Sequence, residues 1–261
     1  MRTRSQVLLV LLLAALCFQV GGFANAAEEE ELSKFELYLE VDVKFDKIGE
    51  YVETVKEFNA FLAKYKFPYE CQAYREMDKF TYCIPLDSCA DLDKLHVEYM
   101  KVLKKGGDEL KSINERLTSC LDSINKSFGP RLTDLWHLPE NGGYEWDSDK
   151  SCYCEVWEFH LYPGARNGFM AILKEYSDLL KEKKVTQSVT FGATSIGQNL
   201  PSFWVASIAA TKADHAKDSE QVKEMLGQAR FDIMKKSNKF IKDIKVNRFN
   251  YDASLSYYPK K

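Results

Sequence analysis

The chain has 261 residues, of which 45% are hydrophobic, and this is enough apolar material for one large domain or two small ones. Lysine and arginine together number 36 against 39 aspartates and glutamates, which gives a formal net charge of -3. Nucleic-acid-binding proteins generally present a basic face. The balanced charge therefore argues against a nucleic-acid partner, and we expect none.

The first 26 residues have the order of a secretory signal peptide. Two arginines precede an apolar run, and small residues at A-x-A spacing end at Ala26. The strong apolar run spans about 10 residues, whereas a membrane-spanning helix needs ~20. We therefore expect cleavage after Ala26, a solvated acidic tail over residues 27–34, a secreted or periplasmic mature protein, and no integral membrane segment.

Six cysteines lie beyond this cleavage site, at Cys71, Cys83, Cys89, Cys120, Cys152 and Cys154. An even number of cysteines in an exported protein predicts disulfides, and Cys71 with Cys83 and Cys89 with Cys120 are candidate pairs. Cys152 and Cys154 would share one face of a strand. Because no second cysteine pair or nearby histidine pair completes a zinc site, we expect no metal and no cofactor.

The strongest pattern in the sequence is an internal repeat with a spacing of 118 residues. Residues 55–62 and 173–180 both have the apolar periodicity of a helix, and their apolar positions coincide at this spacing. The preceding segments, residues 39–44 and 157–162, coincide at the same spacing and alternate as strands do. The repeat therefore includes at least one strand and one helix.

Further elements follow in the same order in both copies. We expect a second strand, a third strand, a second helical stretch and a closing segment; the non-helical ones are residues 70–75, 80–84 and 131–134 in the first copy and 188–193, 203–208 and 248–252 in the second. An Asn-Gly-Gly run at 141–143 is typical of a linker. The shared order and spacing indicate duplication.

The order strand, helix, strand, strand, helix, strand is that of a ferredoxin-like unit. The predicted fold is α+β, with two tandem four-stranded antiparallel sheets, each with helices on one face, packed toward each other. The units are residues 35–139 and 153–261, joined by a linker at 140–152. In element order and spacing the chain resembles the dimeric α/β-barrel superfamily in its fused form. Members of that superfamily include cofactor-independent monooxygenases, haem-handling enzymes, isomerases, decomposition enzymes, stress proteins and purely structural proteins. The resemblance therefore implies an internal chamber and little about its chemistry.

Strand register selects the residues that would face the chamber. Period two places Glu40 and Asp42 opposite the helix-facing apolar residues of the first strand, and Glu158 and His160 are their equivalents in the second copy. Buried carboxylates raise each other's pKa, and a neighbouring histidine can hold or relay a proton. We predict that these four residues form a ligand-contacting or proton-handling site. The alternative is a polar sheet face paired with basic side chains or exposed to water.

Other chemically suggestive residues are weaker candidates. None of the other histidines, His96, His137 and His215, has a serine or cysteine at a spacing typical of a catalytic pair. Trp157 falls in the helix-facing register, where we expect core packing. An N-K-S acceptor for glycosylation begins at Asn125 and is relevant only in a eukaryotic host.

Two function classes follow from these patterns. The first is an exported, non-catalytic protein that binds a small apolar or amphipathic molecule in the chamber. The alternative is a cofactor-independent enzyme of the monooxygenase or isomerase kind that uses the same chamber. The absence of a recognisable catalytic motif favours binding, and the polar chamber residues favour chemistry. The sequence does not specify an oligomeric state.

Overall fold

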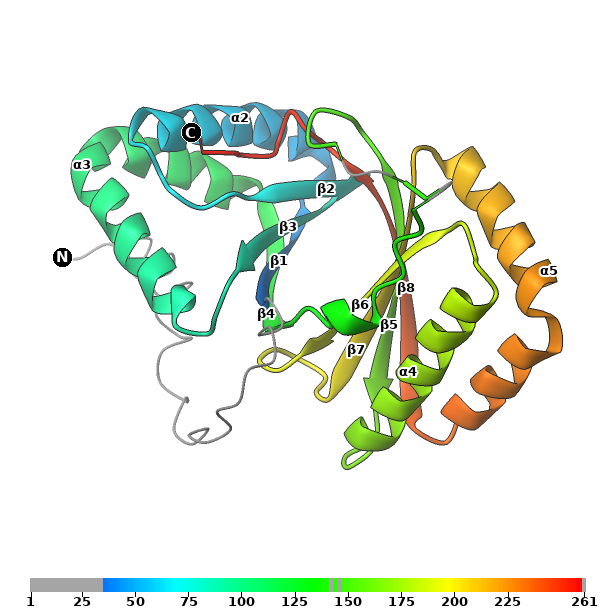
Figure 1. Ribbon diagram of the computed structural model, residues 1–261. Helices are drawn as coiled ribbons and strands as arrows, with labels where there is room; N and C mark the ends of the chain where they lie inside the picture. Colours follow the sequence, from blue (N-terminus) through cyan, green and yellow to red (C-terminus); the bar gives the residue numbers. More distant parts are fainter. Residues whose placement is uncertain (1–34, 141–142, 145–146, 260–261) are drawn as a thin grey trace.

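The structure is a computed structural model that describes residues 35–140, 143–144 and 147–259 (Figure 1). The predicted signal peptide at 1–26, the acidic tail at 27–34 and parts of the predicted linker lie outside these residues. Among the helices of the described residues, none is both long enough and apolar enough to cross a membrane.

The described strands form one eight-stranded sheet with the order β4-β1-β3-β2-β8-β5-β7-β6. The strands are β1 (Phe35–Val43), β2 (Gln72–Glu76), β3 (Lys79–Leu86), β4 (Leu121–Pro130), β5 (Tyr153–Leu161), β6 (Ser188–Thr194), β7 (Ser202–Ala209) and β8 (Ile241–Tyr251). All the strand pairs are antiparallel. Together with the helices, this sheet confirms the predicted α+β class.

Two seams join the first four strands to the last four. At one seam β2 pairs with β8, where Tyr74 lies opposite Tyr251. At the other, β4 and the residues after it contact β6 and the loop after it through backbone bridges, which are Phe128 to Ile196, Arg131 to Gly192 and His137 to Val189. The bridges close the sheet into a barrel. This corrects the expectation of two separate sheets, because pairing at both seams satisfies backbone groups that separate sheets would leave unpaired at their edges.

Four helices cover the outside of the barrel in the described part of the chain. They are α2 (Ile48–Lys64), α3 (Asp91–Cys120), α4 (Arg166–Glu182) and α5 (Lys212–Ser237). Figure 1 shows α2 and α3 against one half of the sheet and α4 and α5 against the other. Leu37, Val41 and Val43 of β1 are each less than 5% exposed, as the alternation of this strand predicts. The apolar cores therefore lie between the helices and the outer face of the sheet.

Local irregularities recur at equivalent places in the two halves. The pairing register shifts after Asp42 in β1 and after His160 in β5, which are 118 residues apart. The helices α3 and α5 each kink at a glycine with positive φ, which is 51° at Gly107 and 47° at Gly227. Positive φ is a conformation that glycine adopts without steric cost. The repeat in the sequence thus coincides with a repeat of backbone detail.

The last strand of each half begins earlier than the sequence pattern suggested. The strands β4 and β8 start at Leu121 and Ile241, whereas closing segments were expected at 131–134 and 248–252. Apolar residues at helical spacing continue past the end of α3, so periodicity alone extended the helix into the strand. Residues Thr133–Leu135 instead form a short 3-10 helix, η2.

The six cysteines of the described residues are all free thiols, contrary to the expectation of disulfide pairs. Burial raises the pKa of Cys71 to about 12 and the pKa of Cys83 well above its usual range. Disulfide exchange proceeds through the thiolate, so burial keeps these two thiols unreactive in the folded state.

Candidate functional site

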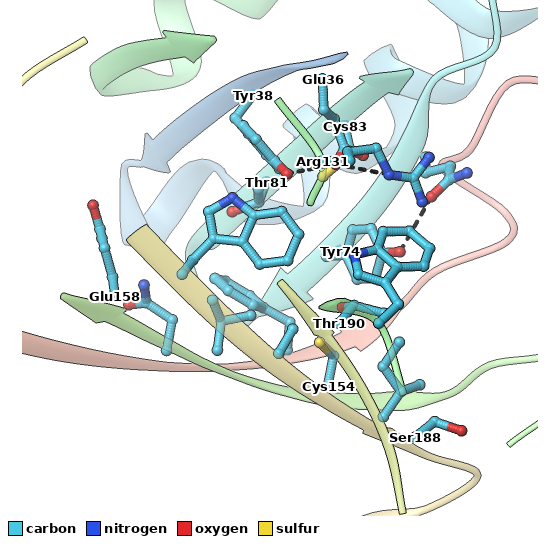
Figure 2. Close-up of a pocket in the computed structure, with 18 of the residues that line it drawn as sticks. Glu36, Tyr38, Tyr74, Thr81, Cys83, Arg131, Cys154, Glu158, Ser188 and Thr190 are labelled. Atoms are coloured by element: carbon cyan, nitrogen blue, oxygen red, sulfur yellow. Dashed lines mark hydrogen bonds and ion pairs between the residues drawn. The ribbon is translucent and has the colours of Figure 1, made fainter. Parts of the chain in front are cut away.

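The barrel contains a cavity of about 840 Å³ with lining residues from all eight strands. Figure 2 shows side chains from both halves around this common space, including Glu36 and Tyr38 of β1 and Cys154 and Glu158 of β5. Small-molecule sites in proteins generally occupy about 300–1,000 Å³. The cavity is therefore large enough for a ligand of ordinary metabolite size.

A buried acid, a phenol and an arginine lie together in this cavity. Glu36 is 7% exposed, and the Tyr38 hydroxyl donates a hydrogen bond to its carboxylate. The Arg131 Nε lies 3.8 Å from Glu36 Oε2 (Figure 2). Desolvation raises the pKa of Glu36, and the opposing effects of Arg131 and Tyr38 do not cancel it. Glu36 therefore keeps its proton to a higher pH than an exposed glutamate does.

Strand pairing and a seam bridge determine where Arg131 lies. Antiparallel pairing of β1 with β4 sets Glu36 opposite Gly129, and Arg131 follows two residues later. The backbone of Arg131 forms a bridge with Gly192, and its guanidinium lies 4.4 Å from the ring centroid of Trp136. A guanidinium over an indole face is a favourable cation–π contact. The arginine is therefore held at both its backbone and its charged end.

Aromatic side chains form much of the apolar surface of the cavity. Trp204 of β7 lies directly opposite Gly192 of β6, and a Cβ atom at Gly192 would come within 2.1 Å of the indole Cζ2. Tyr38 meets the same indole edge-on, with ring centroids 6.0 Å apart and an interplanar angle of 79°. The missing side chain at Gly192 therefore makes the room that the Trp204 ring occupies.

Two of the four predicted site residues, Glu40 and Glu158, line the cavity. Glu40 Oε1 is 3.9 Å from the Lys245 Nζ, and Glu158 Oε1 is 3.7 Å from the His160 Nε2. Burial is the main cause that raises the pKa of Glu158; His160 lowers it, and the charge of Glu40 raises it further. The two equivalent carboxylates are therefore near enough to influence each other, as the register suggested.

The other two predicted residues, His160 and Asp42, are not among the lining residues. His160 is buried behind Glu158, with its Nδ1 at 3.4 Å from the Asn199 carbonyl oxygen. Asp42 accepts a hydrogen bond of 2.6 Å from Ser123 Oγ on the neighbouring strand. His160 can therefore act on the cavity only through Glu158, and Asp42 is already bonded outside it.

Residues outside the predicted quartet make up the other end of the site. Glu36 lies four residues before Glu40 on the same strand, so both side chains point into the chamber. This even spacing is the sequence pattern that could have identified Glu36 as a site residue. Arg131 and Trp204 had no comparable signal, because their approach to Glu36 depends on strand pairing across long stretches of chain. Trp157, expected in the core, is only half-buried and donates a hydrogen bond to Glu155.

The remaining histidines also lie outside the cavity lining. His137 is buried with its Nε2 at 2.6 Å from the Val185 carbonyl oxygen, and His215 has its Nε2 at 2.7 Å from the Ser207 Oγ beneath α5. His137 is thus engaged at the β4–β6 seam, and His215 on the helix-covered side of the sheet. The structure gives neither of them a place in the cavity.

No protein-family model matches this sequence, and no curated protein is significantly similar to it. Solved structures do match its fold. An anthrone oxidase-like protein has a TM-score of 0.57 at 13% identity, covering 85% of this chain and 91% of its own. A candidate monooxygenase from Fusobacterium nucleatum subsp. nucleatum has a TM-score of 0.53 at 11% identity, covering 85% and 94%. A variant of chlorite dismutase from Candidatus Nitrospira defluvii has a TM-score of 0.51 at 10% identity, covering 87% and 94%.

At identities this low the likeness extends to the fold. The chain shares with these proteins an α+β barrel fold, which agrees with the element order of its sequence. The class of protein is therefore an α+β barrel with an internal chamber.

Proposed function

We propose that this protein binds a small amphipathic molecule in the barrel cavity. The observation that carries the proposal is the cavity of about 840 Å³, which combines aromatic walls with a few convergent charged groups. Ligand pockets generally have this composition, because apolar walls provide affinity and a few polar groups fix orientation. Glu40 and Glu158 are the proposed polar contacts at one end of the ligand, and His160 positions Glu158.

The test uses a neutral fluorescent probe, N-phenyl-1-naphthylamine, together with native mass spectrometry of the purified protein. Ala206 lines the cavity and is 6% exposed, so Ala206→Phe should fill ligand space. We expect the probe to bind at one equivalent and to bind at least ~10-fold more weakly to Ala206→Phe, since a 1.4 kcal/mol loss is tenfold. Ala60→Phe, at an exposed position of α2, is the matched control.

Thermal unfolding of both variants shows whether the barrel is intact. A wild-type protein that binds no probe and carries no copurifying small molecule contradicts the proposal. Equal probe binding by wild type and Ala206→Phe places the probe elsewhere and also contradicts it.

A second candidate function is cofactor-independent oxygenation. It is favoured by two carboxyl groups, Glu36 and Glu158, which line the same cavity and whose pKa values burial raises. Such a carboxylate is suited to take a proton from an activated CH₂ group of a substrate. The carbanion then reduces dioxygen, and the reaction R₂CH₂ + O₂ → R₂C=O + H₂O balances without a further reductant.

Anthrone, named in one of the similar structures, is a suitable first probe for this second candidate. Oxygen uptake that is stoichiometric with anthraquinone formation, and that falls in Glu36→Gln or Glu158→Gln, would support it. Glu53→Gln, in the exposed part of α2, is the control. No uptake above the rate in buffer leaves binding as the function.

The domain organisation and location of the protein complete the proposal. We propose that residues 35–139 and 153–261 are duplicated ferredoxin-like units joined by a linker at 140–152. The equivalent register shifts and helix kinks support this division. We also propose export after cleavage at Ala26. Sequencing the amino terminus of the protein recovered from a secreting host tests that site directly.

A further inference from the structure

Arg131 is the only cationic side chain among the described residues that line the cavity. Four acidic side chains share the lining with it, at Glu36, Glu40, Glu140 and Glu158. A lone arginine, fixed by the seam bridge to Gly192 and by the ring of Trp136, is an organised positive centre within this space. Its position therefore separates one end of the cavity chemically from the end near Glu158.

The hydrogen-bonding capacity of Arg131 is largely unused by the described residues. Its Nε is buried without a hydrogen bond, because the 3.8 Å separation from Glu36 is longer than a hydrogen bond. The carboxylate of Glu36 instead accepts from Tyr38. No described residue accepts a hydrogen bond from the terminal nitrogens of Arg131. A guanidinium has five N–H donors in a planar fork that fits an oxyanion with two parallel hydrogen bonds.

The second half of the barrel has no equivalent of this group. Tyr251 takes the place of Arg131, since it bridges to β2 as Arg131 bridges to β6. The Tyr251 hydroxyl donates to the Ser148 carbonyl oxygen, and Cys154 occupies the position equivalent to Glu36. The pseudo-symmetric cavity therefore has an arginine at one end and, among the described lining residues, only acidic charged side chains at the other, so its two ends are chemically different.

We infer that Arg131 binds the acidic group of the ligand, and that the cavity takes one amphipathic organic anion per chain. This inference rests on the proposed binding function and specifies the ligand class. The anion takes the free donors of the guanidinium, and its apolar body lies along the wall that includes Trp204. Glu36 competes with the anion for Arg131, so the ligand must displace a weak intramolecular ion pair.

Two probes with the same ring system test the inference. 1-Anilinonaphthalene-8-sulfonate carries an anionic group, and N-phenyl-1-naphthylamine lacks it. In Arg131→Gln we expect the sulfonate probe to bind roughly 10- to 100-fold more weakly, as expected for charge-assisted hydrogen bonds, and the neutral probe to bind as in wild type. Glu36→Gln should strengthen sulfonate binding. Arg248→Gln removes an equal charge from the outer face of β8, where Arg248 pairs with Glu155. It should leave the affinity for both probes unchanged.

Arg131→Lys keeps the charge, loses the planar fork and is the second variant if Arg131→Gln does not fold. It should weaken the binding of the sulfonate probe alone and leave the far-UV circular dichroism and the unfolding midpoint unchanged. If either variant loses affinity for both probes equally, Arg131 has a purely structural role and the inference is overturned. Unchanged sulfonate affinity overturns it while leaving the proposed function in place. A wild-type protein that binds neither probe and carries no copurifying small molecule overturns both.

Discussion

Trp204 lies over Gly192 on the adjacent strand, so closely that a methyl group at Gly192 would come within 2.1 Å of the indole Cζ2. Gly192→Ala should therefore force the Trp204 ring to move and destabilise the protein by about 1–3 kcal/mol, the usual cost of overpacking. Urea unfolding measures this change. Gly49→Ala, where nothing lies within 4 Å of the added methyl group, should be neutral or stabilising by up to about 1 kcal/mol. Equal stability of Gly192→Ala and wild type would show that the ring has room elsewhere.

Cutting the linker should leave the barrel assembled. Residues 147–150 form a turn between the two halves, and a protease site placed there separates them covalently. We expect the two fragments to elute together in size-exclusion chromatography, because β2–β8 pairing and the β4–β6 bridges hold them. Urea should release two fragments of the expected masses, which verifies the cut. Fragments that elute separately without urea would mean that the seams contribute little.

Thiol chemistry distinguishes the free cysteines of the structure from the disulfides suggested by the sequence. A chain without residues 1–26 should give six titratable thiols when unfolded without reductant. In the folded state Cys89 should react first with Ellman's reagent, since it is the exposed cysteine of the six. Cys83 should be slow, because burial raises its pKa and suppresses the thiolate. A titre of four or fewer in the unfolded protein would restore the disulfide hypothesis.

Glu36 should make stability decrease as the pH rises from acid to neutral values. Burial raises its pKa above the ordinary value of 4.5, so the folded protein keeps this proton to a higher pH than the unfolded chain. The cost of ionising the buried group is absent below about pH 4.5 and complete above the raised pKa. The stability of Glu36→Gln relative to wild type should therefore increase between pH 4 and pH 7, as measured by urea unfolding.

The matched variant for this measurement is Glu53→Gln, which removes a carboxylate from the exposed face of α2. Its stability difference from wild type should be nearly the same at both pH values. If Glu36→Gln behaves in the same way, the ionisation of Glu36 is not coupled to folding.

Periodicity in the sequence was sufficient for the faces of the first strand and for its repetition, although it misplaced the start of the last strand in each half. Alternation over β1 placed Leu37 and Val41 against the helices and Glu40 on the opposite face, because successive side chains in a strand point to opposite sides whatever they pack against. The spacing of 118 residues likewise identified Glu158 as the equivalent of Glu40. These features depend on neighbouring residues, so the sequence contains them directly.

Only the tertiary structure decided how the sheets close and which side chains meet inside. One barrel formed in place of two facing sheets because β2 pairs with β8 and β4 bridges to β6. Within the first half, the pairing of β1 with β4 brought Arg131 beside Glu36 and left Asp42 bonded to Ser123 outside the cavity. Such contacts join residues far apart in the chain, and their burial and charge depend on strand pairing that no local pattern specifies. The sequence by itself determined the repeated elements and their faces, and the pairing of their edges determined the site.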